Sequence, residues 1–285
     1  MGTRININGE INEEGFVSVF DHGFLFGDSV YEVISTYNNK PCFLDEHLKR
    51  LRASAAGIDL KIPYSQDRFI VEVSKTILAA GNSESYIRIV VTRGIGEIDI
   101  DPSTCDRPNV VIYVTEGKNY PAEDYSHGIN LAIVTVKRNP REALNPGIKT
   151  GNYLNNVLAK MEASKLGAKD ALMLNPFGYL TESTTSNFFF IREGRILTPS
   201  LDCGILAGIT RELVIQLAQE NGVPVEEGEW STDDLEMADE MFITGTLKKL
   251  MPVSHLDGRA IGNGKPGPVT RRLMKLYDFF IENMV

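Results

Sequence analysis

Apolar and polar residues follow two alternating patterns along the chain. Some segments are short runs rich in β-branched and aromatic residues, which are typical of strands, whereas others repeat apolar residues at the spacing of amphipathic helices. The first pattern predicts strands within residues 5–9, 10–20, 28–44, 85–94, 108–117, 129–138, 170–175, 179–184, 187–199 and 240–246. The second pattern predicts helices within residues 44–58, 66–81, 152–167, 208–222 and 267–284.

Turn and cap residues define several of these elements more closely. Residues 5–20 are typical of a short hairpin, and Asn38 and Asn39 are expected to join two further strands. Asp45 is the expected N-cap of the first long helix, and Gly57 its end. Because segments of both periods alternate throughout the chain, the predicted fold class is α+β or α/β in two domains.

A polar segment separates the two predicted domains. Residues 118–128 contain a proline and show neither apolar period, which predicts an interdomain linker. The expected domains are a small N-terminal α/β domain over residues 1–117 and a large domain over residues 129–285. A length of 285 residues suits two domains of this kind.

Composition and charge exclude several classes of function. The net charge of −9 and the isoelectric point near 5.1 argue against nucleic acid as a partner, because phosphate contacts need a basic surface. No apolar run approaches the roughly 20 residues of a membrane span, and the polar, acidic N-terminus is unlike a signal peptide. The three cysteines form no metal-type cluster with the four histidines, so we expect reduced cysteines, no metal and a cytoplasmic location.

One lysine occupies an unusual position. Lys149 lies in the segment NPGIKTGNYLNNVLAK, between a Pro-Gly turn and an amphipathic helix, with uncharged neighbours on both sides. A solvated surface amine is one interpretation. The other is an amine held among apolar groups, where desolvation disfavours the ammonium form. A neutral amine is a nucleophile that forms Schiff bases, notably with pyridoxal phosphate.

Pyridoxal phosphate makes further demands that the chain can meet. It needs a carboxylate beside the pyridine nitrogen and donors for its phosphate, which a helix N-terminus supplies well. Glu182 in GYLTESTTSNFFFI is a candidate carboxylate, and Arg50 in EHLKRL a candidate cation. The segment LAGITRELV leads a glycine turn into a helix at Ile209 and Thr210. Taken singly, these residues also fit a surface glutamate, a solvated arginine and an ordinary N-cap at Thr210.

Six segments together resemble one known family. FGDSVYEV, EHLKRL, YIRIVVTRG, IKTGNYLNNVLAK, YLTESTTSNFFFI and LAGITRELV are similar to segments of the class IV aminotransferases, the fold-type IV pyridoxal-phosphate enzymes. The resemblance runs from about residue 5 to the C-terminus. It implies a small domain and a larger domain with the cofactor held between them, amino acid and 2-oxo acid substrates, and a homodimer.

The resemblance also implies roles for particular residues. Lys149 matches the lysine that forms the Schiff base and later moves the proton between Cα and C4′, and Glu182 matches the partner of the pyridine nitrogen. The remaining matches to cofactor-binding positions are Arg50, the backbone of Ile209 and Thr210, Thr246 in ITGTLKK and Tyr153 in GNYL. Two half-reactions of this kind give ping-pong transfer of the amino group.

The subgroup is less clearly indicated than the family. YIRIVVTRGIGEIDIDP, NYLNN and GKPGPVTRRLM are similar to branched-chain aminotransferases, but YEV with Tyr31, STTSN and GTLKK depart from that pattern. Tyr31 and TTSN look more like D-amino acid aminotransferases, in which a matching tyrosine helps to hold the α-carboxylate. The Arg-x-His motif that usually follows VTRG in those enzymes is missing, because IGEIDIDP follows it here.

Another group must then bind the substrate carboxylate. Lys248 is the first candidate, with assistance from Arg88 and Arg93, and the alternative is that Lys248 points to solvent. The favoured activity is D-amino acid:2-oxoglutarate transamination. Branched-chain L-amino acid transamination is the alternative, and aminodeoxychorismate lyase the third.

Overall fold

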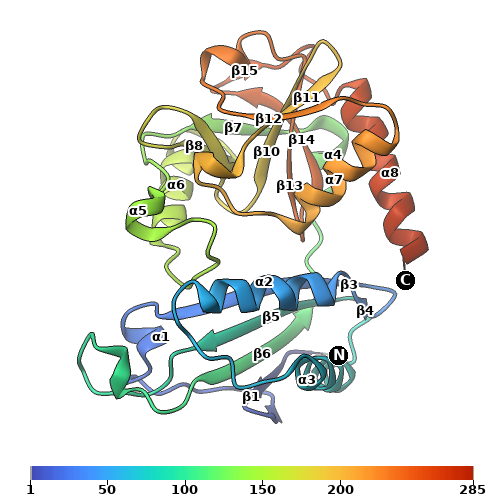
Figure 1. Ribbon diagram of the computed structural model, residues 1–285. Helices are drawn as coiled ribbons and strands as arrows, with labels where there is room; N and C mark the ends of the chain where they lie inside the picture. Colours follow the sequence, from blue (N-terminus) through green and yellow to red (C-terminus); the bar gives the residue numbers. More distant parts are fainter. Residues whose placement is uncertain (1, 285) are drawn as a thin grey trace. The chain divides into compact units, whose positions relative to one another are not determined.

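The computed structural model describes residues 2–284, so residues 1 and 285 of the predicted domains lie outside the described part. Contacts between Cα atoms divide the chain into two compact units (Figure 1). The first unit extends to Lys118 and also includes Ile148–Asn152, and the second comprises Asn119–Gly147 and Tyr153–Met284. The segment that carries Lys149 therefore belongs to the first unit, although it lies within the predicted large domain.

The first unit is built on a six-stranded antiparallel sheet in the order β2-β1-β6-β5-β3-β4. Its elements are β1 (Arg4–Ile7), β2 (Glu10–Asn12), α1 (His22–Leu25), β3 (Ser29–Tyr37), β4 (Lys40–Pro41), α2 (Leu44–Ala56), α3 (Gln66–Ala80), β5 (Ser85–Thr92) and β6 (Asn109–Glu116). The hairpin near the N-terminus and the turn at Asn38 and Asn39 form as the sequence indicates, with both asparagines at positive φ.

Alternation along the strands gives this sheet two different faces. Alternate residues of β3, β5 and β6 form one apolar cluster with buried side chains of α2 and α3, such as Leu48, Leu51 and Phe69. The residues between them point the other way, because successive side chains of a strand face opposite sides. Tyr31 and Arg88 lie on that second face, which contributes polar and aromatic groups rather than core.

The second unit contains a sheet of nine strands that closes on itself. Pairing runs β12-β11-β10-β13-β14-β7-β8-β9, β9 pairs again with β10, and β15 pairs with β14. The strands are β7 (Ile129–Ile133), β8 (Asp170–Leu174), β9 (Leu180–Ser183), β10 (Asn187–Arg192), β11 (Arg195–Pro199), β12 (Val225–Gly228), β13 (Glu240–Gly245), β14 (Lys249–Leu256) and β15 (Arg259–Ala260). The helices are α4 (Ala122–His127), α5 (Arg141–Leu144), α6 (Leu154–Lys165), α7 (Ile209–Glu220) and α8 (Pro268–Met284).

The segment expected as a linker differs from the prediction. Residues 122–127 form α4, and the Tyr125 hydroxyl donates a hydrogen bond to the Lys248 carbonyl at 3.2 Å. The Asp124 carboxylate also accepts from the Lys169 ammonium. Polar composition hid this helix because side-chain contacts within the second unit, rather than an apolar period, hold it in place.

Two local predictions were wrong. The N-cap of α2 is Phe43 at φ +54°, whose side chain makes no capping hydrogen bond. Asp45 lies in the first turn, where the positive end of the helix dipole stabilises a carboxylate. The strand expected over residues 187–199 is a hairpin, because Glu193 and Gly194 both adopt positive φ and turn the chain. The sequence pattern also missed β12, β14 and β15.

Within residues 2–284, no helix is both long enough and apolar enough to span a membrane. The same residues contain no group of three or more His, Cys, Asp or Glu side chains arranged to hold a metal ion. The overall fold is a mixed α/β arrangement, as the strand and helix periods predicted.

Candidate active site

Lys149 sits at the edge of the sheet of the first unit. Residues 30 and 150 form an antiparallel bridge, and the Tyr31 amide donates to the Lys149 carbonyl at 3.0 Å. The Lys149 amide in turn donates to the Ser54 hydroxyl of α2 at 3.1 Å. The backbone of Lys149 is therefore fixed by both β3 and α2, which leaves its side chain as the adjustable part.

The amine of Lys149 lies against Tyr31. Its Nζ donates to the Tyr31 hydroxyl at 3.4 Å and lies 4.5 Å from the centre of the ring. The tyrosine is 4% exposed, so this contact forms in a largely dry environment. Positive charge over an aromatic face is attracted by the ring quadrupole, and a nearby hydroxyl gives the amine a polar partner. The interpretation of Lys149 as a solvated surface amine does not fit these contacts.

Arg88 contacts tyrosines instead of a carboxylate. Its guanidinium carbon lies 3.9 Å from the centre of the Tyr31 ring, and Tyr86 and Tyr113 stack on each other beside it on β5 and β6. Among the described residues, no Asp or Glu side chain forms an ion pair with Arg88. A half-buried guanidinium surrounded by phenol rings is well suited to bind an external carboxylate.

Arg50 projects from α2 and pairs with a buried carboxylate. Its Nε donates to Glu32 Oε1 at 2.7 Å and its Nη2 to Glu32 Oε2 at 2.8 Å. Its side chain is only 15% exposed, so it is not the solvated arginine of the alternative interpretation. The charge of Lys149 is close enough to this group to help lower the pKa of His47, after burial and the charge of Arg50.

Arg93 has a structural role that the sequence did not indicate. Its Nε and Nη2 donate to Asp28 at 2.8 and 3.0 Å. Its Nη1 and Nη2 also donate to the carbonyls of Asp59 and Ile58, just after α2. Two of these four bonds join the end of β5 to the residue before β3, and the other two join it to the chain just after α2. The assistance of Arg93 in substrate binding stays a prediction.

Glu182 is buried in the second unit, at 5% exposure, where β9 pairs with β10. Its Oε1 accepts from Arg138 Nε at 3.0 Å, and its Oε2 accepts from the Leu206 amide at 3.1 Å and from Asn187 Nδ2 at 3.4 Å. Donors of this kind stabilise the ionised carboxylate. The alternative of an exposed strand-edge glutamate is excluded by its burial.

The N-terminus of α7 is open to an anion. Gly208 is the N-cap, and no side chain caps the amides that begin the helix at Ile209 and Thr210. A Cβ on Gly208 would lie 2.0 Å from Asn187 Oδ1, so this approach requires glycine. Unpaired amides and the positive end of the helix dipole together favour a phosphate. The N-cap expected at Thr210 is wrong, because the helix already begins at Ile209 and Gly208 precedes it.

The turn that joins β13 to β14 carries Thr246 and Lys248, and here the structure corrects the sequence interpretation. Lys248 Nζ donates to Asp170 Oδ2 at 2.6 Å and to the hydroxyls of Thr185 and Ser186 at 3.0 Å each. These three acceptors match the three donors of an ammonium group. Lys248 is thus not a solvent-exposed charge, because Asp170 and the two hydroxyls accept from its three donors.

The residues described so far fall into one group in each unit. Lys149, Tyr31, Arg88 and Arg50 belong to the first unit, and Glu182, Ile209, Thr210, Thr246 and Lys248 to the second. Tyr153, the N-cap of α6, also belongs to the second unit and begins the helix that follows Lys149. Sequence reasoning missed the partners Glu32, His47, Arg138 and Asp170. Only the EHLKRL segment offered a signal for one of them, since it places His47 and Arg50 three residues apart on a helix.

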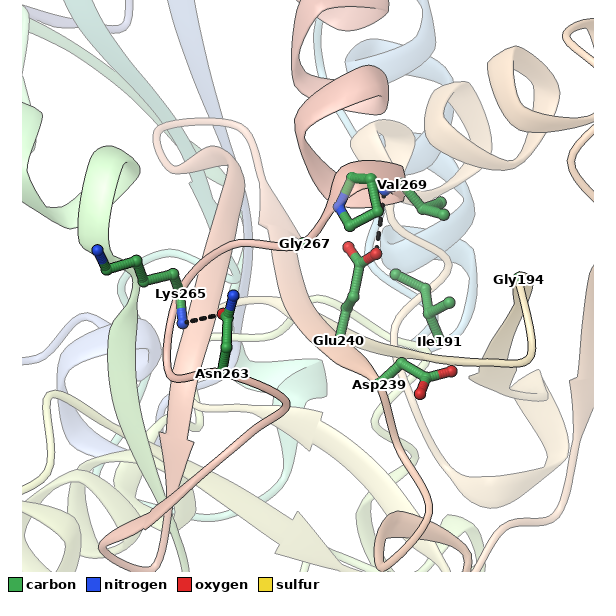
Figure 2. A pocket seen from close by; sticks show the side chains of 9 residues that line it. Ile191, Gly194, Asp239, Glu240, Asn263, Lys265, Gly267 and Val269 are labelled. Carbon is green, nitrogen blue, oxygen red and sulfur yellow. Dashed lines mark hydrogen bonds between the residues drawn. The ribbon is translucent and has the colours of Figure 1, made fainter.

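A separate cavity in the second unit is lined by none of these residues. It has a volume of about 350 Å³ and lies at the start of α8, where Figure 2 shows Glu240 directed towards Val269. Glu240 accepts hydrogen bonds from the amides of Val269 and Thr270 at 3.0 and 2.8 Å. A carboxylate of the protein itself therefore caps this helix, in contrast to α7.

Comparison with known proteins agrees with the architecture. The family model of class IV aminotransferases matches residues 29–256. A Methanocaldococcus jannaschii protein, provisionally named a branched-chain-amino-acid aminotransferase, is 40% identical over 96% of this chain and 95% of its own length. A D-alanine aminotransferase of Listeria monocytogenes is 35% identical over 96% of this chain and 92% of its own.

Solved structures give the same result. The branched-chain aminotransferase of Escherichia coli superposes with a TM-score of 0.94 at 29% identity, covering 99% of this chain and 95% of that one. The branched-chain aminotransferase of Thermoproteus uzoniensis, solved with norvaline, gives a TM-score of 0.91 at 30% identity, covering 99% and 95%. The chain belongs to the class IV aminotransferases, which confirms the predicted family, fold class and enzyme class.

Proposed function

We propose that the protein is a pyridoxal-phosphate-dependent transaminase, with branched-chain L-amino acids as its first candidate donors and 2-oxoglutarate as its acceptor. The observation that carries the proposal is the Lys149 amine, fixed through its backbone at a strand edge and 3.4 Å from the Tyr31 hydroxyl. The cofactor, when bound, supplies an electron sink that acidifies the Cα–H bond of the amino acid.

The residues present fit that cofactor. Lys149 offers the amine for covalent attachment, and Glu182 offers a carboxylate that holds a proton at the pyridine nitrogen. The uncapped amides of Ile209 and Thr210, with Gly208 before them, form a cradle for the phosphate, and Arg50 and Thr246 add donors. Tyr153 is proposed to contact the phenolic oxygen. Once released from the cofactor, Lys149 moves the proton from Cα, as a general base within hydrogen-bond reach.

The choice of donor rests on the β13–β14 turn and on the relatives. The D-amino acid hypothesis is based on Tyr31 and TTSN and needs Lys248 in place of the missing Arg-x-His motif, and Asp170 neutralises the charge of Lys248. With the charge of Lys248 neutralised, the turn presents to the substrate only its own backbone groups and small polar side chains. A turn without a lysine would do the same. D-amino acids remain the second candidate, because the Tyr31 hydroxyl lies beside Lys149, where a donor carboxylate would approach. D-alanine aminotransferases are also among the relatives.

A donor panel tests this proposal. Purified enzyme saturated with pyridoxal phosphate is mixed separately with L-leucine, L-glutamate, D-alanine and D-glutamate while the visible absorption of the cofactor is followed. We expect the two L-amino acids to bleach that absorption and the two D-amino acids to leave it unchanged. Bleaching by the D-amino acids alone would replace the first candidate with the second, and no bleaching by any amino acid would contradict transamination.

Arg88 is proposed to bind a substrate carboxylate. In Arg88→Met we expect the KM for 2-oxoglutarate to rise at least about tenfold, because a charged hydrogen bond of roughly 1.5–3 kcal/mol is lost. The affinity for the cofactor should not change. Arg52→Met is the matched control, since Arg52 also lies over an aromatic ring of the first unit, that of Phe69. An unchanged KM in steady-state assays of Arg88→Met would make Arg88 a purely structural residue.

We also propose a homodimer. The first unit exposes apolar side chains in α1 and in loops, at Phe16, Val19, Phe24, Ile98 and Ile100. In the second unit, α6 exposes Leu154, Val157, Leu158 and Met161 at helical spacing along one face. Extended apolar surface of this kind is typical of protein interfaces. Sedimentation equilibrium would measure the mass in solution.

A further inference from the structure

Glu32 is a carboxylate buried completely under the helices of the first unit. It lies on β3, beside α2, and its side chain is 0% exposed. Three charged or polar donors converge on it, namely Arg50 Nε at 2.7 Å, Arg50 Nη2 at 2.8 Å and His47 Nδ1 at 2.7 Å. His47 is itself buried, with a side chain that is 2% exposed.

The donors of this cluster favour the ionised form of Glu32. Burial alone would raise the pKa of Glu32, but the hydrogen bonds and charges of Arg50, and then of His47, lower it to about 2. Burial lowers the pKa of His47, against the hydrogen bond and charge of Glu32, and its Nδ1–H donates to the carboxylate at 2.7 Å. Glu32 is therefore an anion held between the Arg50 guanidinium and the Nδ1–H of His47.

This arrangement restricts Arg50 more than stability requires. An apolar residue of similar volume would fill the same space without the cost of burying charge. The two parallel N–H···O bonds from Nε and Nη2 instead fix the plane of the guanidinium, and His47 fixes the carboxylate from a second direction. An arginine on a long side chain would otherwise adopt many conformers.

We propose that Glu32 is a positioning residue, which with His47 behind it orients Arg50 for the phosphate of the cofactor. The inference rests on the proposed function, because that function assigns Arg50 to the phosphate. Glu32 touches neither substrate nor cofactor in this proposal and acts only through the guanidinium. Glu32 is not proposed to affect Lys149 or Tyr31, which are the groups assigned to the Cα of the substrate.

The test compares two ligands that differ only in the phosphate. Apoenzyme of the parent and of Glu32→Gln is titrated with pyridoxal phosphate and with pyridoxal, and binding is followed by absorbance and protein fluorescence. We expect the Kd of pyridoxal phosphate to rise about tenfold or more in the variant, because one charged interaction with Arg50 is lost. The Kd of pyridoxal should stay within about twofold.

Matched variants separate positioning from general loss of stability. The quantity compared is the ratio of the pyridoxal Kd to the pyridoxal phosphate Kd. Glu72→Gln removes another buried carboxylate of the same unit, which bonds to Asn6 at 3.0 Å, and should leave this ratio at the parent value. His47→Asn keeps a donor near the Nδ1 position and should retain most of the parent ratio, whereas His47→Ala should lower it. The His47 variants keep the proposal testable if Glu32→Gln does not fold.

Two outcomes overturn the proposal. Equal weakening of both ligands in Glu32→Gln would mean that Glu32 supports only the fold, and an unchanged ratio in both Glu32→Gln and His47→Ala would mean that Arg50 needs no orientation. Failure of the proposed function is distinct, because the parent apoenzyme itself would then bind pyridoxal phosphate no more tightly than pyridoxal.

Discussion

Lys149→Ala is expected to abolish transamination, with kcat/KM falling at least about 10⁴-fold. General acid–base catalysis alone contributes up to roughly 10⁴-fold, and the same amine also anchors the cofactor. Stopped-flow measurement of the first half-reaction with a good donor gives the rate constant directly. The alanine variant keeps the backbone bonds to Tyr31 and Ser54, so the fold should persist.

Lys61→Ala is the control for this result. Lys61 is an exposed lysine of the same unit, so its removal should leave the rate of the half-reaction unchanged. Equal unfolding transitions for the parent and both variants would show that the loss in Lys149→Ala is chemical. A rate within about tenfold of the parent in Lys149→Ala would remove Lys149 from the mechanism.

Lys248→Met is expected to lower the free energy of unfolding by about 3–5 kcal/mol. Asp170 has a side chain that is 4% exposed, and the variant would leave its charge buried without a cation, which is the costly way to break an ion pair. The hydroxyls of Thr185 and Ser186 would lose a donor as well. Equilibrium denaturation in urea, with the slope compared between variants, measures this difference.

The neighbouring lysine supplies the control. Lys249 pairs with Asp278 at 3.5 Å, and both side chains are about half exposed, so Lys249→Met should cost less than about 1 kcal/mol. If Lys248→Met instead left stability unchanged and raised the KM for amino donors, Lys248 would be a substrate residue and the structural interpretation would be wrong.

The ion pair between Lys248 and Asp170 also makes the free energy of unfolding depend on pH. Burial raises the pKa of Asp170, but the charge and hydrogen bond of Lys248, together with hydrogen bonds from Thr184 and the Ala171 amide, lower it below its usual value of 3.8. The stabilisation from this lowered pKa is present above pH 3.8 and is lost as the pH falls through the folded pKa. Lys248→Met removes the charge and the hydrogen bond that contribute most to lowering that pKa, so the folded pKa should rise and the stability deficit of the variant should grow as the pH rises.

The sequence predicted the secondary structure well where the apolar periodicity and the cap or turn residues indicate the same element. The helices α2, α3, α6, α7 and α8 all have a continuous apolar stripe that ends near a glycine or the end of the chain. The misses have local causes. β14 contains Pro252 and a histidine, which weaken its strand pattern, and α4 has almost no apolar period. The closure of the second sheet through β9 and β10 depends on long-range pairing that no local window contains.

The candidate site was predictable to a different extent for cofactor and substrate residues. Lys149, Glu182 and the start of α7 carry local signals, because a turn, a buried strand or a helix start surrounds each of them. The partners of Lys248 and Arg93 could not be predicted, because the charge of a side chain says nothing about its partner. Asp170 lies 78 residues before Lys248, and Asp28 lies 65 residues before Arg93, so only the folded chain reveals either pair.

The most direct test of the central claim is chemical trapping of the cofactor on the protein. Enzyme saturated with pyridoxal phosphate is reduced with borohydride, digested and mapped by mass spectrometry. We predict one stable adduct, on the peptide that contains Lys149, and none at that position in Lys149→Ala. An adduct on a different lysine, or no adduct at all with the parent protein, would contradict the assignment of Lys149 as the residue that binds the cofactor.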